Sequence, residues 1–254
     1  MQVFEKKSDI KHCLSSLKRQ NKQIGFVPTM GTLHDGHLTL INESKKNNDV
    51  TVVSIFINPT QFNNKEDLEK YPKTVKSDLA LLKNTNCNCD FVFIPSVEEI
   101  YGNDVVSNYF SFDGLEHQME GKYRKGHFDG VATVVKKLFE VIIPDKAYFG
   151  EKDFQQLQIV KKMVQKNELP VQIVGCPILR EKDGLAMSSR NTRLTAEQRE
   201  AAPFIYQMLN SVKKQATEKS IEELSTFVKA KFEKHTVLDL EYFTIADEST
   251  LLTP

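Results

Sequence analysis

The chain has 254 residues, and its 34 basic and 34 acidic side chains give a formal net charge of zero. This balance excludes the global basic field typical of nucleic-acid-binding proteins, so we expect no nucleic-acid partner. The longest apolar run, residues 50–57, is too short to span a bilayer, and the first residues lack the apolar core of a signal peptide. We therefore expect a cytoplasmic protein without a membrane association.

The first two thirds of the chain alternate strand patterns with helical patterns. Residues 24–27 and 50–57 are apolar runs, and residues 38–46 between them show helical spacing. A nearly continuous apolar run is typical of a parallel strand covered on both faces, so this region predicts a β-α-β unit. The same patterns predict helices over residues 73–83, 127–143 and 150–166, and strands over residues 91–94, 147–149 and 171–174.

Gly175 and Pro177 mark a predicted domain boundary, which separates residues 1–175 from residues 176–254. In the second domain, two helices are predicted from capping-box patterns, Thr195 with Gln198 and Ser220 with Glu223. The alternating residues Leu238, Leu240 and Tyr242 predict a half-buried strand. The second domain should therefore be a small α+β unit.

The stretch between residues 24 and 37 predicts a strand, a tight turn and the start of a helix. Pro28 cannot donate to a sheet ladder, and Gly31 permits backbone geometry that other residues avoid. A helix that begins at such a turn directs unpaired N–H groups and its positive dipole end outward, which favours phosphate. His34 and His37, three residues apart, can donate to phosphoryl oxygens from one face of the first helical turn.

Three other interpretations of this stretch remain open: a two-histidine metal site, a pair of surface histidines, and an ordinary turn that contains histidine. Helical zinc pairs usually sit four residues apart, and no glutamate lies between these two. A nucleotide phosphate site fits the strand-turn-helix context better.

Three further polar clusters, residues 58–61, 150–156 and 187–190, lie at predicted strand ends or loops. Open α/β sheets usually bind their ligands at the carboxyl ends of the strands. Gln61 and Gln156 lie in two of these clusters, and their amide side chains can both donate and accept hydrogen bonds.

Taken together, these segments resemble the pantothenate synthetase (pantoate-beta-alanine ligase) family over nearly the whole chain. The matching motifs are Pro-Thr-Met-Gly-x-Leu-His-x-Gly-His, Asn-Pro-x-Gln-Phe, Gly-His-Phe-x-Gly-Val, Tyr-Phe-Gly-Glu-Lys-Asp-Phe-Gln-Gln-Leu and Asp-Gly-Leu-Ala-Met-Ser-Ser-Arg-Asn. The resemblance implies a Rossmann-like nucleotidyltransferase domain over residues 1–175, followed by a small mobile lid domain over residues 176–254. It also implies a homodimer in the cytoplasm.

The chemistry that this resemblance implies has two steps. Mg-ATP and pantoate form a pantoyl adenylate and release pyrophosphate, and the amine of beta-alanine then displaces AMP to give pantothenate. The implied ATP-binding residues are Met30, Gly31, Thr32, Leu33, His34, Asp35, Gly36, His37, Gly150, Glu151, Lys152, Asp153, Leu179, Met187, Ser188, Ser189 and Arg190. The implied catalytic residues among them are His34, His37, Lys152, Ser188, Ser189 and Arg190.

The remaining implied contacts concern the two organic substrates and the metal. Gln61 and Gln156 match the pantoate-binding glutamines, Gln61 is also expected at beta-alanine, and Asp78 is expected to help hold Mg²⁺. Further candidates near the same pocket are Asn58, Tyr71 and Arg124. A carboxylate that attacks phosphorus has no proton to lose, so we expect His34 and His37 to stabilise charge rather than to transfer a proton.

The chain departs from the family pattern in two places. Lys125 stands where the family commonly has proline, and the chain ends at Pro254, earlier than family members usually end, which predicts an abbreviated lid domain. The cysteines Cys13, Cys87, Cys89 and Cys176 match no catalytic residue of the family, and we interpret them as structural, reduced thiols.

Two other functions remain open at this point. The first is another adenylate-forming nucleotidyltransferase of the same superfamily, including one that acts on tRNA, although the balanced charge disfavours it. The second is a module that binds a nucleotide without turning it over. The histidine pair with Lys152 and Arg190 favours an enzyme over such a module.

Overall fold

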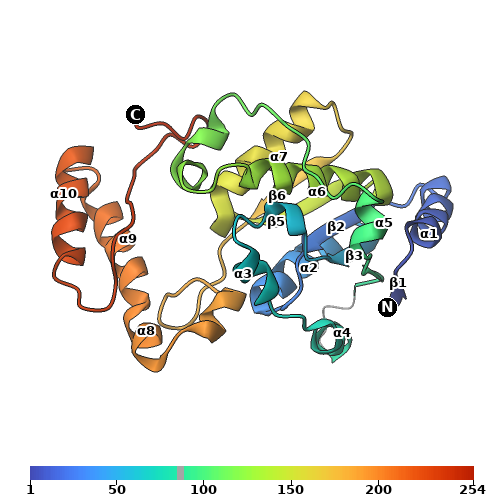
Figure 1. Cartoon of the computed structure of the whole chain (residues 1–254), viewed down its shortest axis with the longest axis horizontal. Coiled ribbons are helices and arrows are strands. Elements are labelled where there is room, and N and C mark those ends of the chain that lie inside the picture. The colour runs from blue at the N-terminus through green and yellow to red at the C-terminus, as the bar shows by residue number, and fades with distance from the viewer. Residues whose placement is uncertain (85–88) are drawn as a thin grey trace. The chain divides into compact units, whose positions relative to one another are not determined.

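A computed structural model describes residues 1–84 and 89–254 of the chain. The chain divides into two compact units, Met1–Pro177 (unit 1) and Ile178–Pro254 (unit 2). Unit 1 is an α/β fold built on one six-stranded sheet (Figure 1). All strand pairs in this sheet are parallel, as predicted from the apolar strand pattern.

The six strands lie in the order β1-β4-β3-β2-β5-β6. Their bounds are β1 Gln2–Phe4, β2 Ile24–Thr29, β3 Val50–Ile55, β4 Phe91–Phe93, β5 Lys146–Gly150 and β6 Gln172–Cys176. From β2 the chain adds β3 and β4 on one side, and it later adds β5 and β6 on the other. The strand order therefore reverses between β2 and β5, where open α/β sheets bind their ligands.

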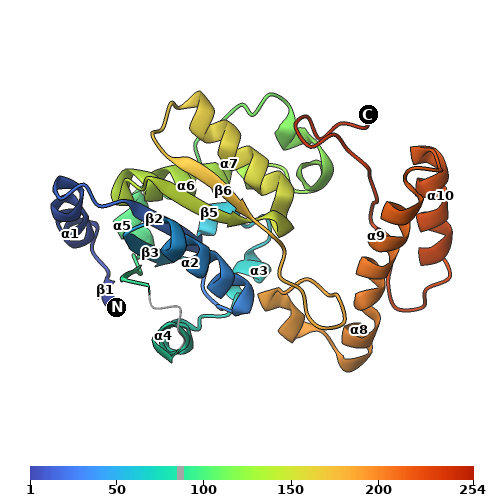
Figure 2. The ribbon, with the colours of Figure 1, turned by 180° about the vertical axis from the view of Figure 1, so that it is seen from behind.

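The helices of unit 1 cover both faces of the sheet. Their bounds are α1 Lys7–Arg19, α2 Asp35–Asn47, α3 Lys65–Glu69, α4 Val75–Asn84, α5 Val97–Tyr101, α6 His127–Ile142 and α7 Phe154–Lys166. Short 3-10 helices are η1 Pro59–Gln61, η2 Leu115–His117, η3 Met119–Lys122 and η4 Glu151–Asp153. Figures 1 and 2 show α2 on one face of the sheet and α6 with α7 on the other.

Both cores follow from the pattern of apolar residues. On one face, Ile41 of α2 and Leu82 of α4 join a buried cluster with Val53 of β3. On the other face, Phe139 of α6 meets Phe26 of β2 edge-on, with ring centroids 6.2 Å apart. A fully buried side chain of this size contributes roughly 1.5–3 kcal/mol, so these contacts fix the sheet between its helices and give the strand ends a rigid frame.

Unit 2 is helical, with η5 Ser189–Arg193, α8 Ala196–Ala201, α9 Pro203–Gln215 and α10 Ile221–Phe232. Both predicted capping boxes are confirmed. The Thr195 hydroxyl accepts from the Gln198 N–H at 3.2 Å, and the Gln198 amide oxygen accepts from the Thr195 N–H at 3.0 Å. Ser220 and Glu223 exchange the same pair of hydrogen bonds at 3.2 and 2.8 Å.

The predicted strand through Leu238, Leu240 and Tyr242 is wrong, because these residues have no regular secondary structure. Leu238 and Leu240 pack instead against the helical cluster of unit 2, which includes Leu224 and Phe232. Within unit 2, the only β pairing among the described residues is the isolated bridge between Arg180 and Ala186. A segment packed on helices alternates its apolar residues just as a strand does, so the pattern did not distinguish the two.

Several short elements were not predicted, among them β1, α3 and α5. Only Phe4 of β1 is buried, so this edge strand carries little periodic signal. Cys87, which we interpreted as structural, lies outside the described residues. Within the described ranges, no helix combines the length and the apolar character needed to cross a membrane.

Candidate functional site

The turn that connects β2 to α2 is strained and internally braced. Gly31 has φ +83° and Thr32 has φ +53°, which is unusual for a β-branched residue and costs on the order of 1–3 kcal/mol. The Thr29 hydroxyl donates to the Ser54 carbonyl of β3 at 2.7 Å and accepts from the Gly31 N–H at 3.2 Å. The surrounding structure therefore holds the backbone in a conformation that it would not adopt alone.

Asp78 of α4 supplies most of this support. Its Oδ2 accepts from the Thr32 N–H and from the Thr74 hydroxyl, both at 3.0 Å, and its Oδ1 accepts from the Leu33 N–H at 2.8 Å. The residue is 3% exposed. A buried carboxylate that accepts two consecutive N–H groups fixes the path of the turn. The sequence had suggested only a magnesium ligand at Asp78, because a contact between residues 46 positions apart leaves no local pattern.

His34 and His37 cap the start of α2 reciprocally. The Nδ1 of His34 accepts from the Gly36 N–H at 3.1 Å, and the Nδ1 of His37 accepts from the His34 N–H at 3.2 Å. A backbone N–H can only donate, so both Nδ1 atoms are unprotonated and each neutral ring carries its proton on Nε2. The ring centroids are 4.2 Å apart. The pair therefore offers two Nε2–H donors at a helix N-terminus.

His37 also stays neutral over the physiological range. Burial, followed by the nearby His34 and then Lys152, lowers the pKa of His37 from 6.5 to about 3. Lys152 belongs to the turn after β5, so its charge reaches the His37 ring from a different strand-turn-helix segment. The two predicted phosphate turns of unit 1 therefore converge at the reversal of strand order.

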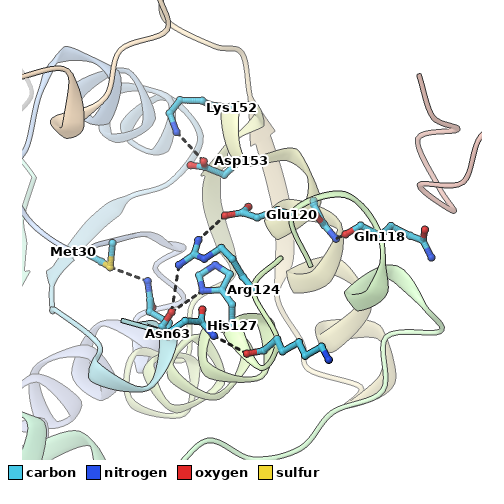
Figure 3. Close-up of polar contacts among 11 residues, drawn as sticks. Met30, Asn63, Gln118, Glu120, Arg124, His127, Lys152 and Asp153 are labelled. Carbon is cyan, nitrogen blue, oxygen red and sulfur yellow. Dashed lines mark hydrogen bonds and ion pairs between the residues drawn. The ribbon is translucent and has the colours of Figure 1, made fainter. Parts of the chain in front are cut away.

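The second turn runs from Gly150 through η4 into α7. Lys152 donates to Asp153 Oδ1 at 2.8 Å, and both side chains are exposed (Figure 3). An exposed ammonium next to the histidine pair can bind phosphate oxygens, while Asp153 can accept from hydroxyl groups. These properties are compatible with the predicted roles of Lys152 at the phosphates and Asp153 at the ribose hydroxyls, which stay predictions.

Gln61 ends η1, after the carboxyl end of β3, and three side chains hold it. Asn58 Nδ2 donates to Gln61 Oε1 at 3.1 Å. The Gln61 carbonyl accepts from His127 Nδ1 at 2.8 Å and from Arg124 Nη2 at 3.5 Å. Figure 3 shows His127 and Arg124 together, with Glu120 paired to Arg124 at 2.5 Å. Both the amide and the main chain of this predicted substrate-binding residue are fixed.

Helix α6 can approach η1 because its first turn contains a glycine. A Cβ atom on Gly130 would lie 2.4 Å from the Thr60 carbonyl oxygen and 2.8 Å from the Gln61 Cα. Both neighbours are backbone atoms and cannot move aside cheaply. His127, at the start of α6, therefore reaches the Gln61 carbonyl only because residue 130 has no side chain. His127 belongs to one of the family motifs, but no local sequence signal indicates its contact with Gln61.

The two adjacent glutamines of α7 face different surroundings. Gln155 is buried, and its Nε2 donates to the carbonyls of Leu115 and Gln118 at 2.8 and 2.7 Å. It therefore holds the η2–η3 segment against α7. Gln156 is half-buried and lies about 100° further around the helix. Of the two, Gln156 is the more exposed, and its role as a ligand-binding residue stays a prediction.

The predicted site residues Leu179 and Met187–Arg190 lie in unit 2. Met187 N donates to the Leu179 carbonyl at 3.0 Å, which closes a short hairpin before the Ser188–Arg190 loop. Ser188 Oγ caps η5 by accepting from the Arg190 N–H at 3.2 Å. Two contacts attach the hairpin to the helices of unit 2: Arg199 pairs with Asp183 at 2.6 Å, and the Arg180 guanidinium lies 3.8 Å from the Tyr206 ring centroid.

The described cysteines have no catalytic setting. Burial raises the pKa of both Cys89 and Cys176 to about 11, and it also raises the pKa of Cys13. At neutral pH these groups are thiols rather than nucleophilic thiolates. This supports their interpretation as structural residues.

A family model of pantoate-beta-alanine ligases matches residues 2–254. The chain belongs to this family. The ligase is 56% identical over 253 residues to the pantothenate synthetase of Flavobacterium psychrophilum, which covers 100% of this chain and 89% of the relative. It is 52% identical over 251 residues to the pantothenate synthetase of Christiangramia forsetii. This match covers 99% of this chain and 88% of the relative.

Solved structures of the family match the ligase along its length. The pantothenate synthetase of Thermus thermophilus is 38% identical, with a TM-score of 0.92, over 100% of this chain and 90% of that chain. The pantoate-beta-alanine ligase of Francisella tularensis, complexed with beta-gamma ATP and beta-alanine, is 38% identical, with a TM-score of 0.80. This match covers 91% of this chain and 86% of that chain. The predicted Rossmann-like nucleotidyltransferase fold is confirmed.

The lowered pKa of His37 predicts a pH dependence of folding. Between its ordinary pKa of 6.5 and about 3, the unfolded chain binds a proton that folded His37 does not, so the free energy of unfolding falls as the pH falls. His37→Asn keeps an oxygen that accepts from the His34 N–H but does not titrate. Urea titrations should show the wild-type ligase losing about 1–2 kcal/mol more than this variant between about pH 7 and 5. Equal losses would contradict the shift.

The role of Asp78 predicts a catalytic defect in Asp78→Asn. An amide keeps an oxygen for only one of the Thr32 and Leu33 N–H groups and turns its own N–H donors toward the other, so the turn should relax and adenylate formation at saturating substrates should slow by on the order of 100-fold. Asp145→Asn is the matched control, because Asp145 accepts from the Ile24 N–H at the other end of β2, at 2.6 Å. Single-turnover measurements should show a near-normal rate for the control. A defect in Asp78→Asn that high magnesium concentrations abolish would favour the metal-ligand role instead.

Proposed function

We propose that this ligase condenses pantoate with beta-alanine in two steps, both at the carboxyl edge of its sheet. A pantoate carboxylate oxygen attacks the α-phosphorus of ATP, the bond to the β-phosphate oxygen breaks, and pyrophosphate leaves. The amine of beta-alanine then attacks the acyl carbon of the pantoyl adenylate, loses a proton, and displaces AMP. The observation that carries this proposal is the reciprocal histidine cap, which uses both Nδ1 atoms as acceptors and leaves the ring protons on Nε2, at a helix N-terminus that favours an anion.

ATP binding is assigned to two segments of unit 1 and one of unit 2. Residues 30–37 cradle the phosphates with the N-terminus of α2, and residues 150–153 bind the adenosine and carry Lys152. Unit 2 contributes the backbone of Leu179 and the Met187–Arg190 loop, whose hydroxyls and guanidinium are phosphate donors. The Francisella tularensis relative is complexed with beta-gamma ATP, which supports ATP as the nucleotide.

The histidines act as charge stabilisers in this mechanism. Charge builds up on the oxygens of the α-phosphate during attack, and neutral donors that already point at them need no reorganisation. The attacking carboxylate releases no proton, and pyrophosphate leaves as an anion, so the first step requires no general acid. His37, with a pKa of about 3, would be a poor reservoir of protons at neutral pH.

Pantoate is assigned to Gln61 and Gln156, and beta-alanine also to Gln61. Gln61 follows β3 and Gln156 follows β5, and these two strands flank β2 in the sheet. A substrate held between the two glutamines would have its carboxylate near the histidine pair. The described thiols offer no activated nucleophile, which supports direct transfer through a free adenylate rather than a covalent enzyme intermediate.

Magnesium is proposed to enter with ATP and to be held chiefly by phosphate oxygens, the usual arrangement for this ion. Among the described residues, no three His, Cys, Asp or Glu side chains gather in a group that could hold a metal. Asp78 fits a supporting role, because its Oδ1 accepts a single N–H and keeps a free lone pair beside the turn. The ion would neutralise charge on the leaving pyrophosphate.

The cytoplasmic location and the homodimer are also proposals. The buried, high-pKa thiols support a reducing compartment. The segment before α6 exposes Val105, Val106 and Tyr109, which are 43%, 63% and 84% exposed, and a partner copy would cover such side chains. The second candidate function, another adenylate-forming nucleotidyltransferase, finds less support, because the relatives that match at 52–56% identity along the chain are pantothenate synthetases.

A product assay tests the proposed reaction. With ATP, pantoate and beta-alanine present, phosphorus NMR should detect AMP and pyrophosphate in equal amounts, and leaving out either organic substrate should stop net AMP formation. Lys152→Ala should slow the reaction by about two to three powers of ten, the scale of losing one oriented donor. Stoichiometric ADP and phosphate would refute the acyl adenylate, and pyrophosphate exchange driven by amino acids other than beta-alanine would favour the alternative enzyme.

The pantoate assignment predicts a selective defect in Gln156→Ala. Each lost hydrogen bond costs on the order of 1 kcal/mol, so the dissociation constant of pantoate should rise about fivefold or more while that of ATP stays nearly constant. Gln158→Ala, on the same helix, is the matched control and should bind both ligands normally. Calorimetric titration separates the two ligands. A loss of ATP affinity with intact pantoate affinity would place Gln156 in the wrong subsite.

A further inference from the structure

Tyr101, the last residue of α5, belongs to a buried hydrogen-bond network that ends at Gln61. Its hydroxyl donates to Asn58 Oδ1 at 2.6 Å, and Asn58 Nδ2 in turn donates to Gln61 Oε1 at 3.1 Å. Asn58 is 1% exposed and Tyr101 is 7% exposed. Burial raises the pKa of Tyr101, so its hydroxyl remains a donor at neutral pH. The network connects a residue outside the proposed substrate pocket to one inside it.

Backbone groups determine which way the Asn58 amide faces. The Gly130 carbonyl, which can only accept, lies 3.1 Å from Asn58 Nδ2. The Thr60 N–H, which can only donate, lies 3.4 Å from Asn58 Oδ1, and the Thr60 hydroxyl also donates to this oxygen at 3.2 Å. Tyr101 supplies the shortest of the donors to Oδ1. The amide nitrogen of Asn58 is therefore the atom that faces Gln61.

This orientation sets the Gln61 amide in turn. Because Asn58 donates, Gln61 must direct its Oε1 toward Asn58 and its Nε2 away from it. The Nε2 lies 2.9 Å from Met30 Sδ, in the turn between β2 and α2 (Figure 3). A thioether sulfur is a weak acceptor, so a substrate oxygen can take its place. His127 and Arg124 fix the Gln61 main chain, which leaves the amide orientation to Asn58.

We infer that Tyr101 is a positioning residue of the ligase: acting through Asn58, its hydroxyl holds the Gln61 amide with its N–H groups toward the substrate. This inference rests on the proposed binding of pantoate and beta-alanine at Gln61. The subsite then selects an oxygen acceptor, such as a carboxylate or hydroxyl oxygen, and rejects a group that can only donate, such as an ammonium. Beta-alanine would therefore meet Gln61 with its carboxylate rather than its amine.

Tyr101→Phe tests the inference, because it removes only the hydroxyl. The ring, whose centroid lies 6.5 Å from that of the Phe56 ring on which it stacks, is kept. Without its shortest donor, Asn58 should turn its amide part of the time, and Gln61 with it. The matched control is Tyr148→Phe, since the Tyr148 hydroxyl also bonds an asparagine amide, Asn48 Nδ2 at 2.7 Å, and the ring is 1% exposed.

Steady-state AMP formation should give Tyr101→Phe a KM for pantoate raised about five- to thirtyfold, the range that corresponds to the roughly 1–2 kcal/mol cost of one buried hydrogen bond. Its KM for ATP and the kinetics of Tyr148→Phe should stay within about twofold of wild type. An unchanged KM for pantoate, or an equal rise for ATP and pantoate, would overturn the positioning role.

A second variant, Thr60→Val, keeps the inference testable if Tyr101→Phe does not fold. Thr60→Val removes a weaker donor to Asn58 Oδ1 and keeps the side-chain shape, so it should shift the KM for pantoate in the same direction by a smaller factor. If neither variant shifts it, the inference fails even where Tyr101→Phe is unstable. A wild-type ligase that forms no AMP from pantoate would instead contradict the proposed function, and the comparison of variants keeps the two failures apart.

Discussion

Unpaired backbone N–H groups between β2 and α2 are the constraint on which the site depends. A strand that turns directly into a helix leaves several donors without partners. In this ligase, Asp78 accepts from Thr32 and Leu33, and the Nδ1 atoms of His34 and His37 accept at the first turn of α2. Because the backbone occupies both Nδ1 atoms, the rings keep their protons on Nε2. Local backbone geometry thus decides the protonation state of the histidine pair.

The strand order brings the other functional groups to this turn. The sheet grows from β2 in both directions, so the segment after β3 carries Gln61 on one side, and the segment after β5 carries Lys152 on the other. Rigid packing maintains the arrangement, since α6 approaches η1 closely only because residue 130 is glycine. The geometry of the candidate site therefore depends on a few close backbone approaches as much as on its polar side chains.

Local signals in the sequence predicted much of this structure, and tertiary contacts account for the rest. The capping box at Thr195 and the turn at Gly31 were predictable because the interacting groups lie within a few residues of each other. The support from Asp78 and the network from Tyr101 to Asn58 were not, since they join residues 46 and 43 positions apart without periodicity. The strand predicted through Leu238 was wrong. Alternating apolar residues indicate that one side of a segment is buried, and a segment that packs on helices shows this pattern just as a strand in a sheet does.

The central claim is that the backbone fixes both histidines as neutral Nε2–H donors. Long-range proton-nitrogen NMR of the imidazole rings in the ¹⁵N-labelled ligase measures this directly, with His34→Asn and His37→Asn assigning the signals. At about pH 8 both rings should have a protonated Nε2 and an unprotonated Nδ1, and the His37 pattern should persist to about pH 5. A proton on Nδ1 of either ring, or a His37 titration near its ordinary pKa of 6.5, would contradict the account.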